Sequence, residues 1–174
     1  LGAAWHDLEH TGYGFDFPPV GERMDRLEEA LQICRAMFER DHVDFDGAHY
    51  RTEDARNLPR PVQSGGPEIL VGGGGERRTL RLVAQYADAC NLHGDPAGIR
   101  QKLDVLHRHC ADVGRDPDEI RVTRLATLVI TSSAQQTGEL QDFLARAAGP
   151  EALTTSNLGR PGEVVEQLHA LAEA

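Results

Sequence analysis

Cysteine, basic charge and long apolar runs are all scarce in this sequence. Its three cysteines, Cys34, Cys90 and Cys110, lie far apart and form no Cys-X-X-Cys pair. This number and spacing favour neither a disulfide framework nor a zinc ribbon, so we expect a protein of the reducing cytoplasm. Each cysteine lies in an apolar periodic segment, which predicts a small buried side chain and not a nucleophile or a ligand.

Acidic charge outweighs basic charge. The chain carries 18 lysines and arginines against 28 aspartates and glutamates, a formal net charge of -10, and Lys102 is its single lysine. A chain without a basic, counterion-releasing surface is not expected to bind nucleic acid or an anionic membrane. No apolar run approaches the roughly 18 residues of a membrane-spanning helix, and no secretory leader is apparent, so we expect neither a membrane span nor secretion.

The length of the chain predicts one globular unit. Its 174 residues, of which 40% are hydrophobic, suffice for one core and are too few for two full domains. The sequence starts at Leu1 and not at a methionine, which suggests a fragment or a processed protein.

The first third of the chain combines a helix with a hairpin. Between residues 18 and 40 the apolar residues recur at the spacing of one helix face, at Val20, Met24, Leu27, Leu31, Cys34 and Phe38. Residues 43–52 then alternate around Asp46-Gly47, a dipeptide that predicts a tight hairpin turn with positive φ angles. Residues 56–66 are rich in turn formers and predict an irregular connection.

The remainder alternates between strands and helices. The pattern predicts a strand at 69–71 buried on both faces, a helix at 76–86, a strand at 87–92, a helix at 96–113 ended by Gly114, one long strand at 120–131, and helices at 139–148 and 161–174; residues 154–158 form a possible further strand. Short joins between strand and helix indicate about four βα units on a parallel sheet, and hence an α/β fold.

Four consecutive glycines follow the strand at 69–71. Glycines between a buried strand and a helix leave backbone N–H groups unobstructed, and a helix start adds unpaired N–H groups and a positive dipole end. Arg77, Arg78 and Thr79 follow and can bond a phosphate. The alternative is a flexible joint between strand and helix. The spacing matches neither the nucleoside-triphosphate loop nor the dinucleotide-binding glycine pattern.

Two further segments have polar residues with open roles. His6 and His10 in HDLEH would share one helix face, but Thr11-Gly12 stops a helix and no third ligand lies nearby, so we expect no metal site. Asn91 follows the strand-like run ADAC at the C-terminal end of the strand predicted at 87–92, where its amide either meets a ligand or makes an ordinary turn bond.

Three ordered motifs resemble one family. The runs PEILVGGGGERRTLRLVAQYADACNLHG, LGAAWHDLEHTGYGFDFPPVGERMDRLEEALQICRAMF and FDGAHYR are similar to the luciferase-like flavin and deazaflavin oxidoreductases, especially the branch that uses coenzyme F420. The resemblance implies a (β/α)8 TIM barrel with cofactor and substrate at the C-terminal ends of its strands. A complete barrel takes ~250 residues. Residues 1–174 therefore correspond to the C-terminal half to two-thirds of a barrel, with LGAAW at the end of a mid-barrel strand, and the pocket residues of the early strands have no counterpart here.

The resemblance also implies roles for individual residues. The expected cofactor-binding residues are Trp5, Gly72, Gly73, Gly74, Gly75, Arg77, Thr79 and Asn91, and the candidates for proton handling are Glu9 and His10. Gly73 and Gly74 would present N–H groups to a cofactor phosphate, with Arg77 adding charge. Trp5 would either pack on the cofactor ring or cover the core.

The implied activity is hydride transfer between the deazaflavin F420 and an unidentified small organic substrate. One alternative is a monooxygenase that uses FMN and dioxygen. Another is a non-catalytic remnant that binds flavin or forms oligomers. A partial barrel leaves open strand edges and an uncovered apolar face, so we expect a homo-oligomer.

Overall fold

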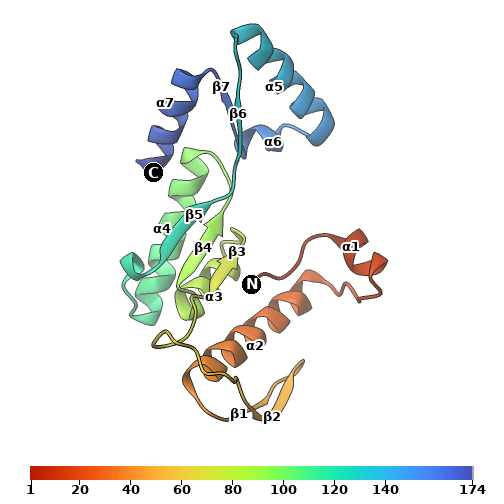
Figure 1. Cartoon of the computed structure of the whole chain (residues 1–174), viewed down its shortest axis with the longest axis vertical. Coiled ribbons are helices and arrows are strands. Elements are labelled where there is room, and N and C mark those ends of the chain that lie inside the picture. The colour runs from red at the N-terminus through yellow and green to blue at the C-terminus, as the bar shows by residue number, and fades with distance from the viewer. Residues whose placement is uncertain (174) are drawn as a thin grey trace.

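The computed structural model describes residues 1–173 and shows an open succession of helices and strands (Figure 1). In chain order the elements are α1 (Asp7–Gly12), α2 (Val20–Glu39), β1 (Val43–Asp46), β2 (Arg51–Ala55), β3 (Leu70–Gly72), α3 (Thr79–Tyr86), β4 (Ala89–Leu92), α4 (Pro96–Val113), the 3-10 turn η1 (Pro117–Glu119), β5 (Arg121–Arg124), β6 (Thr127–Ile130), α5 (Ala134–Ala148), α6 (Glu151–Thr154), β7 (Ser156–Gly159) and α7 (Pro161–Ala172). The α2 helix and the β1–β2 hairpin form the lower part of Figure 1, β3 to β5 with α3 and α4 the middle, and β6 to α7 the upper part.

The middle part holds the hydrophobic core. β3, β4 and β5 pair in parallel in that order, as the βα pattern predicts. Ile69, Val71, Cys90 and Leu92 lie buried on the sheet face that packs against α2, α3 and α4. Leu70 points the other way and is 36% exposed, so the prediction that this strand is buried on both faces is wrong.

The free edge of β3 carries the start of the chain. The Leu1 ammonium donates to the Leu70 carbonyl at 2.6 Å, and the Gly72 N–H donates to the Leu1 carbonyl at 2.9 Å. These two bonds form a parallel bridge opposite Val71. The first residue therefore lies where the resemblance puts the end of a preceding strand.

The predicted hairpin forms, but its turn differs. β1 and β2 pair antiparallel with Asp46 opposite Arg51, so four residues connect them, and Gly47 does not have a positive φ. Instead, the Glu29 carboxylate of α2 accepts the N–H groups of three loop residues, Ala48, His49 and Tyr50. The loop conformation is thus fixed by a carboxylate from a distant helix, a contact that dipeptide preferences do not encode.

The predicted long strand at 120–131 is wrong because it breaks in two. β5 ends at Arg124 and pairs with β4, whereas β6 begins at Thr127 and pairs in parallel with β7 in a separate sheet. Arg124 spans the break: its guanidinium donates to the carbonyls of Gly94 and Thr154 and, at 2.6 Å, to Asn157 Oδ1.

The elements from β6 to α7 leave much of their apolar surface exposed. β7 confirms the possible strand near residues 154–158, and α5 begins five residues before the predicted start at 139. None of the α5 residues is buried. Leu128 and Ile130 of β6 are 57% and 53% exposed, and Phe143 of α5 is 57% exposed. A complete barrel is not formed within residues 1–173; the parallel strands and outer helices make up part of one.

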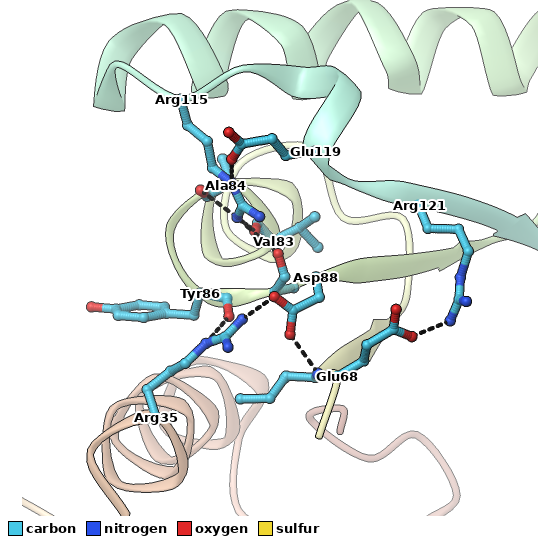
Figure 2. Close-up of polar contacts among 11 residues, drawn as sticks. Arg35, Glu68, Val83, Ala84, Tyr86, Asp88, Arg115, Glu119 and Arg121 are labelled. Atoms are coloured by element: carbon cyan, nitrogen blue, oxygen red, sulfur yellow. Dashed lines mark hydrogen bonds and ion pairs between the residues drawn. The ribbon is translucent and has the colours of Figure 1, made fainter. Parts of the chain in front are cut away.

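A dense polar network closes the N-terminal end of the central strands (Figure 2). Asp88, just before β4, forms an ion pair with Arg35 of α2 at 2.6 Å and accepts a hydrogen bond from the N–H of Ile69 at 2.7 Å. Arg115 donates to the carbonyls at the end of α3, with 2.8 Å to Ala87. Partial burial raises the pKa of Asp88, but its hydrogen bonds to Arg35 and Ile69 outweigh that effect and the net pKa is lowered.

Two compositional expectations can be compared with the fold. Cys90 and Cys110 are fully buried and Cys34 is half-buried, and burial raises the pKa of the Cys90 thiol to about 11, which does not suit a nucleophile. Within residues 1–173, no helix combines the length and the apolar character needed to cross a bilayer.

Candidate functional site

A cleft of about 1250 Å³ opens at the C-terminal end of β3. Its walls are mostly apolar and come from the N-terminal segment, α2, the glycine loop, the segment after β4, and α6. The lining residues are Gly2, Ala3, Ala4, Trp5, Val20, Met24, Gly72, Gly73, Gly74, Gly75, Thr79, His93, Leu125, Ala148, Glu151, Ala152 and Thr155. An apolar cleft with few polar groups at the strand ends of a barrel-like sheet is the usual form of a cofactor site.

The four glycines use their N–H groups in two ways. The Gly72 N–H donates to Leu1 and the Gly73 N–H to the carbonyl of Asn91 at 3.1 Å, so both belong to the sheet. Within residues 1–173, the N–H groups of Gly74 and Gly75 have no acceptor. Among the four glycines, the donors available to an anion are therefore those of Gly74 and Gly75, whereas the predicted donor Gly73 is used within the sheet. Gly73 contributes a φ of 120°, which other residues rarely adopt.

A Cβ added at Gly74 or Gly75 would come close to a neighbouring side chain. A Cβ at Gly75 would lie 2.8 Å from Thr79 Oγ1. A Cβ at Gly74 would lie 2.9 Å from Cε of Lys102, on α4. The neighbour of Gly74 is thus the side chain of Lys102.

The residues after the glycines have different surroundings. α3 begins at Thr79, three residues later than predicted, so a turn separates the glycines from the helix. Arg78 reaches back to α2, where it pairs with Asp25 at 2.6 Å. Arg77 is exposed and makes no ion pair within residues 1–173, and it does not line the cleft, whereas Thr79 does.

Trp5 stands at the mouth of the cleft with 85% of its surface exposed. It therefore does not cover the core. Packing of Trp5 on a cofactor ring stays a prediction.

Glu9 and His10 lie on α1, away from the glycines. His10 Nδ1 lies 3.1 Å from the His6 carbonyl, and the His10 ring packs edge-on against Phe17. Glu9 is within 3.9 Å of His6. Neither residue lines the cleft, so their roles in proton handling stay predictions. α1 spans Asp7–Gly12, so Thr11 and Gly12 lie inside a short helix and do not stop it as predicted. Residues 1–173 contain no cluster of three potential metal ligands.

Asn91 lies in β4, one residue before its end, and His93 comes directly after β4. The Asn91 amide donates to Thr123 Oγ1 at 2.8 Å, and this hydroxyl donates to the Cys90 carbonyl, so the amide N–H is committed within the sheet. His93, which sequence reasoning missed, lines the cleft one residue after β4. Its position just past a predicted strand end is the signal that could have identified it.

Comparison with known proteins agrees with this architecture. The sequence profile described as luciferase-like monooxygenase matches residues 1–155. An F420-dependent glucose-6-phosphate dehydrogenase of Nocardia farcinica (strain IFM 10152) is 43% identical over 77 residues, 44% of this chain and 21% of that protein. Its counterpart in Mycolicibacterium smegmatis (strain ATCC 700084 / mc(2)155) is 38% identical over 117 residues, 63% of this chain and 33% of that protein.

Solved structures share the fold at low identity. An F420-dependent secondary alcohol dehydrogenase in complex with an F420-acetone adduct superposes with a TM-score of 0.80 at 16% identity, covering 99% of this chain and 59% of that one. The long-chain alkane monooxygenase LadA superposes with a TM-score of 0.71 at 15% identity, covering 94% of this chain and 52% of that one. The chain thus spans between a fifth and a third of the two curated relatives and little more than half of these structures.

Proposed function

Because this chain belongs to the luciferase-like monooxygenase family, we propose that it forms the cofactor-holding part of an oxidoreductase that transfers hydride between F420 and a small organic substrate. The similar sequences named F420-dependent dehydrogenases support the choice of F420. The substrate class beyond "small and organic" is left to experiment, beginning with glucose 6-phosphate and secondary alcohols, which the names of the relatives suggest.

One observation carries this proposal: the glycine loop and Trp5 line the same cleft. A deazaflavin cofactor has a planar ring and a phosphate-bearing tail, and therefore needs an apolar surface and anion donors in one space. The cleft has both, because its walls are mainly apolar and the N–H groups of Gly74 and Gly75 are without acceptors in the described chain.

The residues present fit such a group. A side chain at Gly75 would meet Thr79, and one at Gly74 would displace the end of the flexible Lys102 side chain. Trp5, Met24 and Leu125 would bind and orient the ring and exclude water, and the glycine N–H groups with the Thr79 hydroxyl would hold phosphate oxygens. The bound cofactor itself supplies the hydride chemistry.

The family also supports a second candidate, an FMN-dependent monooxygenase. The family description and the superposition on the alkane monooxygenase favour it. The exposed strands of the upper part favour a third possibility, a non-catalytic remnant that binds flavin or self-associates.

Titration of the protein at its full natural length with F420 and with FMN distinguishes these candidates. We expect F420 to bind and FMN to bind at least tenfold more weakly, as measured by quenching of cofactor fluorescence. Tighter binding of FMN would support the monooxygenase. Binding of neither would reject both enzymatic proposals.

A further inference from the structure

We propose that Lys102, on α4, is the cation that binds the phosphate group held by the glycine loop. The proposal rests on the proposed function, because it assumes that a phosphorylated ligand occupies the cleft. The phosphate is either that of the cofactor tail or that of a phosphorylated substrate; both present the same oxyanion.

The position of the Lys102 side chain is the first observation. A Cβ built on Gly74 would lie 2.9 Å from Lys102 Cε, 3.0 Å from Cδ and 3.5 Å from Nζ. The end of the lysine side chain therefore lies against Gly74, which lines the cleft and whose N–H has no acceptor in residues 1–173; Lys102 itself is not a lining residue. The ammonium group on α4 and a backbone donor of the glycine loop thus lie close together.

The loop is fastened to the helix that carries the lysine. Gln101 Nε2 donates to Glu76 Oε1 at 2.8 Å, and His109 Nε2 lies 2.8 Å from the Glu76 carbonyl. Two contacts from different turns of α4 therefore hold the residue that follows the glycines. This attachment keeps Lys102 and Gly74 at a fixed separation, as a preorganised anion site requires.

The charge of Lys102 is not neutralised within residues 1–173. None of the ion pairs there includes it. Glu76, the nearest acidic residue in the loop, is bonded to Gln101. Lys102 is half-buried, so its charge is partly shielded from water and acts over a short distance.

Other cations near the cleft are already engaged. Arg78 pairs with Asp25 and Glu28, and Arg23 donates to the carbonyls of Ala3 and Pro18. Arg77 is exposed and is not among the nearest neighbours of Gly74 or Gly75, whereas Lys102 is. In a chain with a net charge of -10, a local cation is needed to offset the general repulsion of a phosphate. Among the described cations, Lys102 lies against the glycine loop and forms no ion pair within residues 1–173.

The test uses Lys102→Met, which keeps an apolar stem, in the protein at its full natural length. We expect its Kd for F420 to rise about tenfold or more, since a charge-assisted hydrogen bond is lost. Lys102→Arg should recover part of the affinity. Arg100→Met, which removes an exposed charge from the same helix, is the matched control and should change the Kd less than about twofold.

A double-mutant cycle tests the contact with Gly74. Gly74→Ala should displace the lysine and weaken F420 binding in the wild-type background, and should have no further effect in Lys102→Ala, where nothing is left to displace. Additive effects of the two changes would contradict the proposed contact. Site-resolved acylation gives a second readout: bound F420 should slow the modification of Lys102 severalfold.

Three ligands distinguish the source of the phosphate. If Lys102→Met weakens the binding of F420 but not the binding of an F420 analogue without the phosphate tail, the cofactor phosphate is the partner of Lys102. If it weakens only the binding of glucose 6-phosphate, the substrate phosphate is the partner. Binding of F420 to the wild type with unchanged affinity for every ligand in Lys102→Met would overturn the role of Lys102 while leaving the proposed function. No binding of any phosphorylated ligand to the wild type would overturn both.

Discussion

The polar groups at the N-terminal ends of the central strands have hydrogen-bonding partners, whereas some of those at the C-terminal ends do not. At the N-terminal end, Arg35 pairs with Asp88, Asp88 also accepts the Ile69 N–H, and Arg115 donates to the Ala87 carbonyl (Figure 2). At the C-terminal end, the N–H groups of Gly74 and Gly75 have no acceptor in residues 1–173.

This difference separates stability from binding. Polar groups that bond within the protein stabilise the fold, whereas groups left without partners at a cleft are available to a ligand. Substitutions at the N-terminal end should therefore change the free energy of unfolding and leave ligand affinity alone. Substitutions at the C-terminal end should do the reverse.

The largest expected effect is the absence of turnover in the 174-residue chain by itself. Trp5 is largely exposed, and Glu9 and His10 lie away from the cleft, so the binding end is incomplete in this chain. Positioning alone contributes ~7 to 11 kcal/mol to a catalysed reaction, and an incomplete pocket loses it. The assay is F420-linked absorbance change with the purified chain beside the full-length protein. Measurable turnover by the chain would show that its cleft suffices.

The same chain should not behave as a stable monomer. Leu128 and Ile130 of β6 and Phe143 of α5 expose apolar surface, and β3 offers an open edge beyond Leu1, so self-association or unfolding is favoured. Light scattering after size exclusion, together with a thermal melt, tests this expectation. A monodisperse monomer with one cooperative transition would contradict it.

Replacing Asp88 by Ala should destabilise the fold without weakening cofactor binding. The change removes the partner of Arg35 and of the Ile69 N–H, both charge-assisted contacts, and should cost about 2 to 3 kcal/mol in the free energy of unfolding. Urea unfolding of the full-length protein measures this cost, with the exposed Asp104→Asn as control. A large loss of F420 affinity in the folded variant would break the proposed separation between the two ends.

Stability should also fall at acidic pH because of Asp88. Its pKa is lowered in the folded protein, so it binds protons less readily there than in the unfolded chain. Its contribution is therefore fully present above the unfolded pKa of about 3.9 and is lost as pH falls through the lower folded value. Unfolding measured from pH 6 to pH 3 should show this loss in the wild type. An equal acid dependence in Asp88→Asn would assign it to other groups.

The smallest expected effect is that of Arg77→Ala. The sequence suggests a phosphate contact, but the side chain is exposed and lies outside the cleft lining. Screening by solvent limits such a charge to less than about 1 kcal/mol, roughly a fivefold change in Kd at low salt. Titration with F420 at low and high salt measures it. A salt-sensitive loss of a hundredfold would place Arg77 in direct contact with the phosphate.

The parts of the fold that sequence reasoning predicted correctly are those set by local periodicity. The predicted bounds of α4 are confirmed, because Asp95 caps its start and Gly114 ends it in the left-handed conformation. The break between β5 and β6 is missed because residues 120–131 are rich in apolar and β-branched residues, and only the change of pairing partner divides them.

The site was partly predictable for the same reason. The glycine loop is visible in the sequence because its composition is unusual, and the structure places all four glycines at the cleft. The contact of Lys102 with Gly74 joins residues 28 positions apart by number and follows no period. Such contacts depend on how α4 packs beside the loop, which a single sequence does not specify.

The bonds of Arg124 across the sheet break have a mechanical consequence. The joint at residues 125–126 leaves two small sheets connected by a short backbone link, which by itself would permit one sheet to rotate against the other. The guanidinium grips the segment after β4 through Gly94 and the second sheet through Asn157 and Thr154. Rotation of one sheet against the other must stretch at least one of these hydrogen bonds, so the guanidinium fixes the angle between the two sheets. A lysine at position 124 would keep the positive charge but could not make all three hydrogen bonds, so the two sheets would be freer to rotate against each other.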